Sequence, residues 1–524
     1  MIEALQDCFV TFKMTAFAKP LAHSRPNEIA LRDERVALTW ADVDDALNRV
    51  TNALLAEDLG HSRRIAVYAE NGVETAFANL GGLLAGASVV PVNFHLNTDE
   101  AAYILADSDT RVLFVGPETV ERGLAAAQQV GVHKVIGFRC AAQPGLIAWD
   151  DYLAAAAATE PPSDHAPRPN LLYTSGTTGR PKGTELPPTM FAGGATVAEH
   201  LENMKKNGFA QFGAHLVVGP MYHTGPLSGA RLLAAGVPSV ILGRFDAEKT
   251  LHTIHTYKTE TSVMVPTHFV RLLALPQAIK NKYAVSSMKY VGHTGAKCPV
   301  DVKREMIKWW GPVFFDAYGA SEVGTTCVIN SEEGLAHPGS VGRAVPPFTA
   351  LVLDEAGKPV PPNTEGRLYF KDATGRGVIY HNDPEKSKAA HIEPGTFTLG
   401  EIGYMDADGY VYITDRFSDM VVSGGANIYP AEAEQVLIEH PAVADVACIG
   451  VPHNEMGEEL KALIVPEDPA NPPDAAELIH FCRARLSHYK CPRSVDIVES
   501  VGRNTMDKVN KRALRAPYWK DAVG

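Results

Sequence analysis

Apolar residues early in the chain recur at two spacings, which predict two kinds of element. Val43, Leu47 and Leu54 follow one another at intervals of four and seven residues, the spacing of one face of an α-helix. Either Thr39 or Asp42 can cap the start of this helix with a side-chain oxygen. Unbroken apolar runs of about five residues predict buried strands instead.

The two patterns alternate through residues 28–115, and we expect a hairpin followed by buried strands that helices separate. The expected hairpin joins residues 28–31 to 36–40, the strands cover 64–68, 88–92 and 111–115, and the helices cover 74–85 and 98–108. Strand–helix–strand repetition is typical of an α/β domain with a largely parallel sheet.

The middle of the chain shows a similar organisation after a proline-rich connector at residues 161–169, which follows a helix that we expect to end within 154–158. Helices are predicted at 189–207 and 247–257, and strands at 216–220, 237–242 and 261–265. These elements predict a second α/β layer set.

From about residue 340 the pattern changes to short strands and turns, which predicts a small β-rich subdomain. Its strands are expected at 339–343, 350–354, 366–371 and 409–415, and a compact pattern follows with helices at 430–440 and 474–486 and strands at 443–451, 460–465 and 494–499. We therefore expect an α/β protein with a large N-terminal domain over residues 1–416 and a small α+β C-terminal domain over residues 417–524.

Composition excludes some partners. The net charge of 48 − 61 = −13, without a basic block, argues against nucleic acid and against an anionic membrane surface. No apolar run reaches the length of an integral membrane segment, and the N-terminus lacks a secretion-signal pattern. Seven scattered cysteines without a C-x-x-C pair predict reduced thiols in a cytoplasmic protein and argue against a zinc knuckle.

The strongest chemical signal is the segment 173–183, which combines three glycines, four Ser or Thr hydroxyls and Lys182. Glycines let backbone N–H groups approach a ligand closely, and the hydroxyls and the ammonium add further donors for a polyphosphate. The P-loop pattern of nucleoside triphosphatases does not fit, because Pro181 stands where it has glycine and Gly183 where it has Ser or Thr. The segment is therefore predicted to be a nucleotide-phosphate loop of another kind.

This segment resembles the phosphate-loop signature of the acyl-adenylate-forming superfamily, which includes acyl-CoA synthetases, peptide-synthetase adenylation domains and luciferases. Residues 220–225 are similar to its motif beside the bound carboxylate, where His223 would lie. Residues 291–297 resemble the segment that packs on adenine. Residues 316–322 resemble its Tyr-Gly-x-Thr-Glu motif, with serine in place of threonine.

In that last motif the resemblance implies that Tyr318 stacks on adenine, Ser321 contacts the α-phosphate and Glu322 binds Mg²⁺. Glu401 stands where relatives carry a ribose-binding aspartate, and Arg416 matches the arginine at the domain boundary. The hinge position of relatives, two residues further on, is a serine here.

Residues 502–511 resemble the C-terminal motif whose lysine bridges the carboxylate and the α-phosphate, which assigns that role to Lys508. Asp507 replaces the usual glycine and Gly502 the usual proline. In the second half-reaction the C-terminal domain would rotate, and the loop around Gly424 and Gly425 would line the tunnel for the thiol of coenzyme A.

The implied catalytic residues are Lys508, Glu322, His223 and Lys182. The implied ATP- and coenzyme-A-binding residues are Thr174, Ser175, Gly176, Thr177, Thr178, Gly179, Gly295, Ala296, Lys297, Asp316, Ala317, Tyr318, Gly319, Ser321, Glu401, Arg416, Gly424 and Gly425. The candidate acid pocket comprises Met221, Tyr222, His223, Val265, His268, His293 and Thr294.

The resemblance implies a Mg²⁺-dependent acyl-CoA synthetase that uses ATP to activate a carboxylic acid, with a medium or long aliphatic or a bulky alicyclic acid favoured. An aromatic acid, an enzyme that loads a carrier protein, a P-loop type kinase and a catalytically silent binding protein stay open as alternatives, and so does a homodimer.

Overall fold

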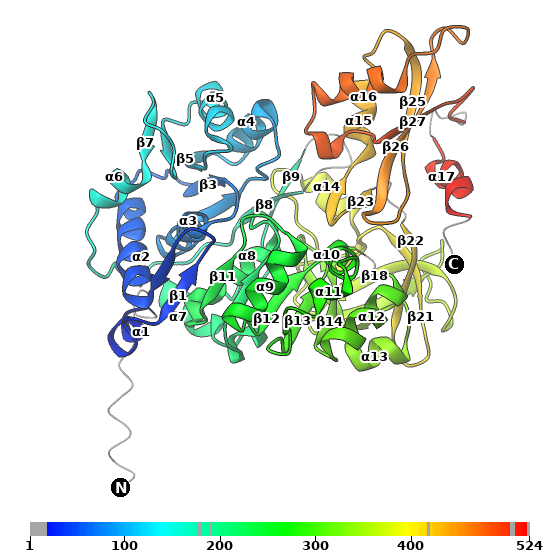
Figure 1. Cartoon of the computed structure of the whole chain (residues 1–524). Helices are drawn as coiled ribbons and strands as arrows, with labels where there is room; N and C mark the ends of the chain where they lie inside the picture. The colour runs from blue at the N-terminus through cyan, green and yellow to red at the C-terminus, as the bar shows by residue number, and fades with distance from the viewer. Residues whose placement is uncertain are drawn as a thin grey trace.

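The computed structural model describes residues 18–174, 181–188, 190–296, 298–416, 420–502 and 509–520. It has three bodies of structure around the centre of the molecule (Figure 1). The N-terminal sheet lies at the upper left, a large mixed sheet lies below, and the C-terminal domain lies at the upper right. The expected fold class, a large α/β N-terminal domain followed by a small C-terminal domain, is confirmed.

The N-terminal sheet is parallel throughout, as predicted, with strand order β4-β3-β5-β6-β7. Its strands are β3 (Arg64–Tyr68), β4 (Ser88–Pro91), β5 (Thr110–Val115), β6 (Lys134–Gly137) and β7 (Leu146–Ala148). The helices of this region are α1 (Ala18–Ser24), α2 (Trp40–Leu55), α3 (Val73–Leu84), α4 (Thr98–Asp107), α5 (Val120–Val130) and α6 (Trp149–Ala154). Thr39 and Asp42 cap α2 together, each accepting from the other's backbone N–H, so both predicted caps are used.

The large sheet begins with the predicted hairpin and continues into parallel and then antiparallel strands. Its first part contains β1 (Ile29–Arg32), β2 (Ala37–Thr39), β10 (His215–Val217), β11 (Ser239–Ile241), β12 (Thr261–Met264), β13 (Tyr290–His293), β14 (Phe314–Ala320) and β15 (Gly324–Asn330). The β-rich region adds β16 (Ser340–Ala344), β17 (Phe348–Leu353), β18 (Gly366–Asp372), β19 (His391–Glu393), β20 (Thr396–Phe397), β21 (Glu401–Met405) and β22 (Val411–Arg416). The predicted short strands are therefore real, and they continue the large sheet by hydrogen bonds.

Helices flank this sheet. They are α7 (Val197–Met204), α8 (Thr224–Arg231), α9 (Ala247–Tyr257), α10 (Pro266–Leu273), α11 (Gln277–Lys280), α12 (Val300–Trp310), α13 (Ser331–Ala336) and α14 (Pro384–Ala389), with short 3₁₀ turns η3 (Gly208–Gln211) and η4 (Leu232–Ala235). A separate two-stranded hairpin of β8 (Leu171–Thr174) and β9 (Lys182–Glu185) lies between the three bodies (Figure 1).

The C-terminal domain is a small sheet with order β24-β23-β26-β25, on which β27 pairs with β26. It contains β23 (Val421–Ser423), β24 (Ala426–Ile428), β25 (Val443–His453), β26 (Gly457–Pro466), β27 (Ser494–Ile497), α15 (Pro430–Leu437), α16 (Ala475–Arg483), η5 (His488–Lys490) and α17 (Lys511–Trp519). The large sheet ends at Arg416 and the small sheet begins at Val421, while residues 417–419 lie outside the described ranges. The boundary expected after residue 416 stays a prediction.

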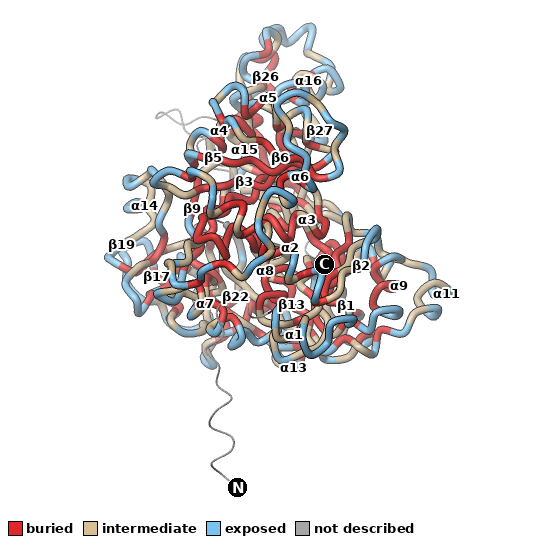
Figure 2. The backbone as a smooth tube through the Cα atoms, turned by 90° about the vertical axis from the view of Figure 1, so that its left-hand side faces the viewer, coloured by how far each residue is buried: buried red, intermediate tan, exposed pale blue. Residues whose placement is uncertain are grey.

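The small sheet separates two apolar clusters, because side chains alternate along a strand. Cys448 of β25 packs with α15 and α16 on one face, whereas Ala447 and Ile449 pack with Val501 and Val509 on the other. Figure 2 shows buried backbone concentrated along the strands, with exposed segments at the loops and outer helices.

One predicted helix has the wrong extent. The helix expected at 189–207 begins only at Val197, because Gly193 and Gly194, a few residues before it, adopt positive φ of 67° and 112°. The helix expected to end within 154–158 does so, at Ala154. Helix α8, which follows Pro220 and His223, was not predicted.

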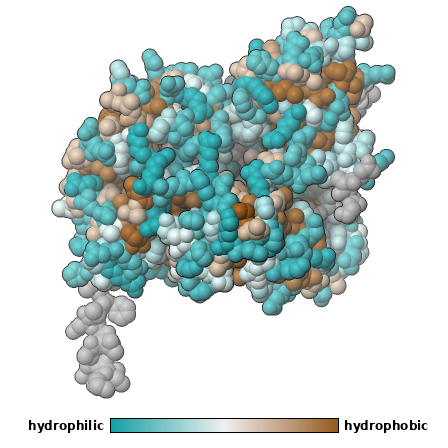
Figure 3. All heavy atoms as spheres, in the orientation of Figure 1, coloured by the Kyte–Doolittle hydropathy of each residue, from teal (hydrophilic) through white to brown (hydrophobic). Residues whose placement is uncertain are grey.

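The surface in Figure 3 is mainly hydrophilic, with apolar residues in separate groups. Within the described ranges, no helix combines the length and the apolar character that a membrane crossing requires.

Candidate active site

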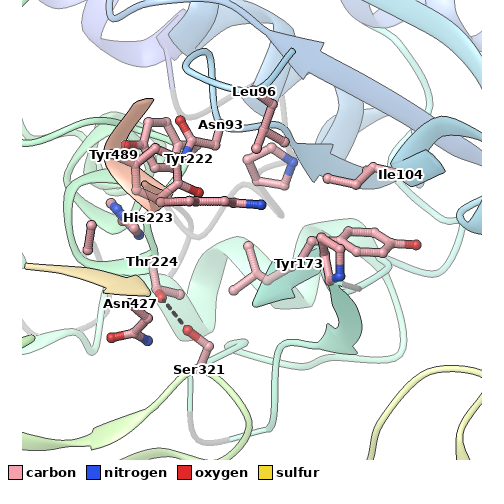
Figure 4. A pocket seen from close by; sticks show the side chains of 15 residues that line it. Asn93, Leu96, Ile104, Tyr173, Tyr222, His223, Thr224, Ser321, Asn427 and Tyr489 are labelled. Carbon is pink, nitrogen blue, oxygen red and sulfur yellow. Dashed lines mark hydrogen bonds between the residues drawn. The ribbon is translucent and has the colours of Figure 1, made fainter. Parts of the chain in front are cut away.

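A pocket of about 90 Å³ lies where the N-terminal sheet, the β8–β9 hairpin, the large sheet and the C-terminal domain meet (Figure 4). Segments that are hundreds of residues apart supply its wall. The lining residues are Pro91, Asn93, Leu96, Ile104, Leu172, Tyr173, Pro181, Tyr222, His223, Thr224, Ser321, Ala426, Asn427, Tyr489 and Lys490.

His223 lies at the N-terminal end of α8, where its backbone N–H donates to the Pro220 carbonyl at 3.0 Å. The ring is exposed to the pocket, and desolvation by the atoms around it lowers the pKa of the imidazole to about 4, so the ring is neutral near pH 7. Its ring lies 4.4 Å from the ring of Tyr222, measured between centroids. The next residue, Thr224, has its hydroxyl 3.4 Å from that of Ser321, and Figure 4 shows this pair at the pocket wall. The pocket thus brings together two predicted segments that are about a hundred residues apart.

The two ends of the predicted phosphate loop border this pocket through Tyr173 and Pro181. Strands β8 and β9 pair antiparallel, and Thr174 lies opposite Lys182 in the register. Tyr173 is fixed by its hydroxyl, which donates to Asp107 at 2.6 Å. The Lys182 ammonium forms an ion pair with Asp383 at 2.8 Å and is 22% exposed. The loop residues Ser175, Gly176, Thr177, Thr178 and Gly179, and the side chain of Thr174, lie outside the described part of the structure.

Glu322 follows Ser321 directly, in the turn between β14 and β15, and is 9% exposed. Its backbone carbonyl accepts from Arg376 at 3.1 Å. Burial lowers the pKa of Lys386, whereas the negative charge of Glu322 raises it. The Glu322 carboxylate and the Lys386 ammonium are therefore close to each other. In the described ranges no cluster of three or more His, Cys, Asp or Glu side chains could hold a metal ion. A metal at Glu322 would therefore need most of its ligands from a substrate and from water, which is the usual arrangement for Mg²⁺ beside phosphates.

Strand β14 carries the rest of that motif. The carboxylate of Asp316 is buried and lies 3.2 Å from the Lys303 ammonium and 3.6 Å from the His293 ring. The carbonyl of Ala317 accepts from the Thr294 hydroxyl at 2.8 Å, which joins β14 to the end of β13. A side chain at Gly319 would approach the Gly324 carbonyl to 2.0 Å, so only glycine fits there.

Of the predicted acid-pocket residues, only Tyr222 and His223 line the pocket described above. Met221 is buried, and its N–H donates to Asn71 at 2.8 Å. His268 stacks on Phe245 with ring centroids 4.0 Å apart. Both are held within the packed interior, and the role predicted for them, and for Val265, His293 and Thr294, stays a prediction.

Glu401 and Arg416 face each other across β21 and β22, since they are register partners. Glu401 is 8% exposed, and the side chain of Arg416 lies outside the described part. The predicted ribose-binding pair is thus adjacent in the sheet. Lys297 and Lys508 also fall outside the described residues.

The hairpin of β23 and β24 brings the C-terminal domain onto the large sheet. Gly425 adopts φ of +84°, and a side chain there would lie 3.1 Å from the side chain of Val265. A side chain at Gly295 would in turn lie 4.0 Å from Gly425. The predicted segments around residues 295 and 424 are therefore in contact, and Ala426 and Asn427 continue into the pocket wall.

Sequence reasoning missed the contribution of Tyr489 and Lys490, which line the pocket from η5, and of Asn93. No local pattern marks a lysine as buried, because burial of Lys490 depends on carboxylates from distant segments. The aromatic side chain of the neighbouring Tyr489 is the only local signal that could have indicated a contribution of this turn to the pocket.

Comparisons with known proteins agree with this geometry. The chain matches the model of the AMP-binding enzyme over residues 19–378 and that of the AMP-binding enzyme C-terminal domain over residues 432–508. It is 29% identical to an indoleacetate–CoA ligase from Aromatoleum aromaticum over 94% of this chain and 95% of the other. It is 30% identical to a fatty acid–[acyl-carrier-protein] ligase, ScoC, from Streptomyces coeruleorubidus, over 96% of each.

Two solved structures of the o-succinylbenzoate CoA synthetase from Bacillus subtilis are 25% identical to the chain, and each match covers 95% of this chain and 97% of the other. The double mutant bound with a product analogue superposes with a TM-score of 0.78, whereas the complex with the acyl-adenylate intermediate gives 0.62. The overall arrangement here is thus more similar to the former. Since the first family model alone covers well over half of the residues, the chain belongs to the AMP-binding enzyme family.

Proposed function

We propose that this protein is an AMP-forming acyl-CoA ligase, which joins a carboxylic acid to AMP and then transfers the acyl group to coenzyme A. The observation that carries the proposal is the convergence of four segments on one pocket: the flanks of the phosphate loop, His223, Ser321 and the β23–β24 hairpin. ATP, Mg²⁺ and coenzyme A are the partners that this chemistry requires.

In the first half-reaction a carboxylate oxygen attacks the α-phosphorus of ATP and pyrophosphate leaves. Catalysis consists of aligning the two groups and neutralising their charges. We assign the β- and γ-phosphates to the loop and Lys182, the α-phosphate to Ser321, and the forming bond to Lys508. Lys182 would exchange its present partner, Asp383, for phosphate oxygens.

The nucleoside is assigned to the neighbouring edges of the sheet. Adenine would lie against Tyr318 and the segment at Gly295 and Ala296, and the ribose hydroxyls would bind Glu401. Mg²⁺ on Glu322 would neutralise phosphate charge, and the donor set fits this use because a single buried carboxylate leaves the remaining ligand positions to phosphates and water. Neutral His223 can donate a hydrogen bond to the bound carboxylate without adding charge.

In the second half-reaction the thiol of coenzyme A attacks the acyl carbon, and AMP leaves. Ala426 and Asn427 of the β23–β24 hairpin already line the pocket, whereas Val509 packs on the face of the small sheet away from α15 and α16. Only one face of that sheet can meet the pocket at a time, so both halves of the reaction require the C-terminal domain to change orientation. The higher TM-score with the product-analogue complex supports the assignment of the present arrangement to the second half.

We favour a medium or long aliphatic acid or a bulky alicyclic acid as the substrate. The indoleacetate ligase among the relatives supports an aromatic acid as the alternative. A panel of carboxylic acids with ATP, Mg²⁺ and coenzyme A, read by thioester formation, tests the proposal: at least one acid should give coenzyme-A-dependent thioester, and none should do so without ATP.

The similarity to ScoC favours a second candidate function, the loading of an acyl carrier protein. The same panel with a phosphopantetheinylated carrier protein in place of coenzyme A separates the two. Thioester on the carrier but not on coenzyme A would support this second function.

A further inference from the structure

A buried lysine joins the two domains at the edge of the pocket. Lys490 is the last residue of η5, and its side chain is only 2% exposed. Its ammonium donates to Glu100 of α4 at 2.8 Å and to Glu432 of α15 at 2.6 Å. One carboxylate belongs to the N-terminal domain and the other to the C-terminal domain. We call these three residues the Lys490 bridge.

The second oxygen of Glu100 binds the same two domains together. It accepts from the Asn97 N–H at 2.9 Å in the capping box of α4, and it accepts from the Ser487 hydroxyl. The Asn97 side chain donates to the Arg485 carbonyl at 3.1 Å. The segment from Arg485 to Lys490 is therefore held on the start of α4 by three polar contacts.

The bridge is built so that it can open. If the domains separate, Lys490 keeps Glu432, which lies in its own domain, and Glu100 keeps its place in the capping box and gains water. Neither charge is left buried without a partner, so separation avoids the several kcal/mol that breaking a buried ion pair otherwise costs. When the domains close, the bond to Glu100 is regained.

We propose that the Lys490 bridge holds the C-terminal domain in the arrangement that forms the thioester, which makes Lys490 a positioning residue for the second half-reaction. The proposal rests on the proposed function. Tyr489 and Lys490 themselves line the same pocket as Asn427, so fixing η5 also fixes part of the pocket wall. In the arrangement for adenylation the bond to Glu100 would be absent, and the first half-reaction does not depend on it.

The substitution Glu100→Gln tests this directly. Glutamine has nearly the same shape and still serves in a capping box, but it lacks the charge that Lys490 binds. Glu333→Gln is a matched control, because Glu333 occupies the same position in the capping box of α13 and contacts Arg343 and Tyr410 within the N-terminal domain.

With pre-made acyl adenylate, Glu100→Gln should slow thioester formation at least about fivefold and raise the KM for coenzyme A. ATP–pyrophosphate exchange should stay within about twofold of the wild type, and Glu333→Gln should change neither rate. Equal losses in both half-reactions of Glu100→Gln would overturn the proposal, since they would indicate general damage to the domain.

Lys490→Met and Lys490→Arg complete the set. Methionine should reproduce the loss in the second half-reaction, and arginine, which keeps the charge, should retain more of that rate. A loss with Lys490→Met that Glu100→Gln does not share would contradict the positioning role and indicate direct contact with the reactants.

Hydrogen exchange of backbone amides tests the bridge without any turnover. Exchange in residues 485–490 should rise in Glu100→Gln and not in Glu333→Gln. Unchanged exchange would overturn the bridge even if the enzyme is an acyl-CoA ligase. Conversely, if no acid supports turnover, the proposed function fails while this measurement still reports on the contact.

Discussion

The pocket histidine His223 illustrates how a single residue limits the chemistry of the site. His223 would be an obvious general base by residue type alone, yet desolvation by the surrounding atoms lowers its pKa to about 4. It is therefore neutral, and unchanged in charge, across the pH range where acid and thiol react. The role that we propose for His223 is therefore to orient the carboxylate by a hydrogen bond, and not to act as a general base.

Substitution of Lys508 tests whether this residue acts in adenylation and not in thioester formation. Lys508→Ala should lower ATP–pyrophosphate exchange by at least about 100-fold, because the charge that stabilises the transition state is removed. Thioester formation from pre-made acyl adenylate should remain near the wild-type rate. Lys520→Ala, at an exposed lysine, is the control. A comparable fall in both rates would contradict the assignment.

Local sequence motifs indicated some residues of the candidate site, whereas residues whose environment depends on distant segments were missed. The phosphate loop, Ser321 and Glu322 stand in short local patterns, so sequence alone could indicate them. Lys490 could not be found in this way, since its burial depends on Glu100, which lies 390 positions away. Exposure of a lysine is the default expectation, and only the fold brings its partners together.

Elements were predicted best where the pattern was periodic and long. The parallel N-terminal sheet and the αβ order of the C-terminal domain are confirmed. The errors lie at glycine and proline. Gly193 and Gly194 delay the start of α7, and α8 was missed because Gly225 and Pro226 suggested a loop, although proline is well tolerated in the first turn of a helix.

A substitution in the β23–β24 hairpin tests whether its contact with the large sheet is needed for thioester formation. Gly425→Ala should weaken thioester formation by about tenfold, because a methyl group there meets Val265 at 3.1 Å and a positive φ strains an alanine by roughly 1–2 kcal/mol. Gly409→Ala has the same φ of +84° but nothing within 4 Å, so it is matched for backbone strain. The two half-reactions are measured separately for each variant, and an equal effect of both substitutions would contradict a role for the hairpin contact.

At the scale of the whole molecule, buried neutral histidines make stability depend on pH. Burial lowers the pKa of four of them, to about 4 or about 3, namely His200, His215, His268 and His293. In the unfolded chain their pKa is about 6.5, so between these values the unfolded state binds more protons. Stability is therefore full above about pH 6.5 and is lost as pH falls toward about 4.

We predict that the urea midpoint of unfolding falls steadily from pH 7 to pH 5. Each histidine contributes up to about 1.4 kcal/mol per pH unit in this interval. Asp44 acts in the opposite direction, because burial raises its pKa to about 6. Burial also raises the pKa of Glu74 and of Glu432, so these carboxyl groups make the fall smaller. A midpoint that is constant or rises between pH 7 and pH 5 would show that these histidines are not buried in the folded protein.

The central claim is that ATP is cleaved between its α- and β-phosphates to activate a carboxylic acid. The most direct measurement identifies the nucleotide that remains after the purified protein has consumed ATP with an accepted acid and coenzyme A. We predict AMP and pyrophosphate, each equal in amount to the thioester formed. ADP and inorganic phosphate in their place would contradict the account.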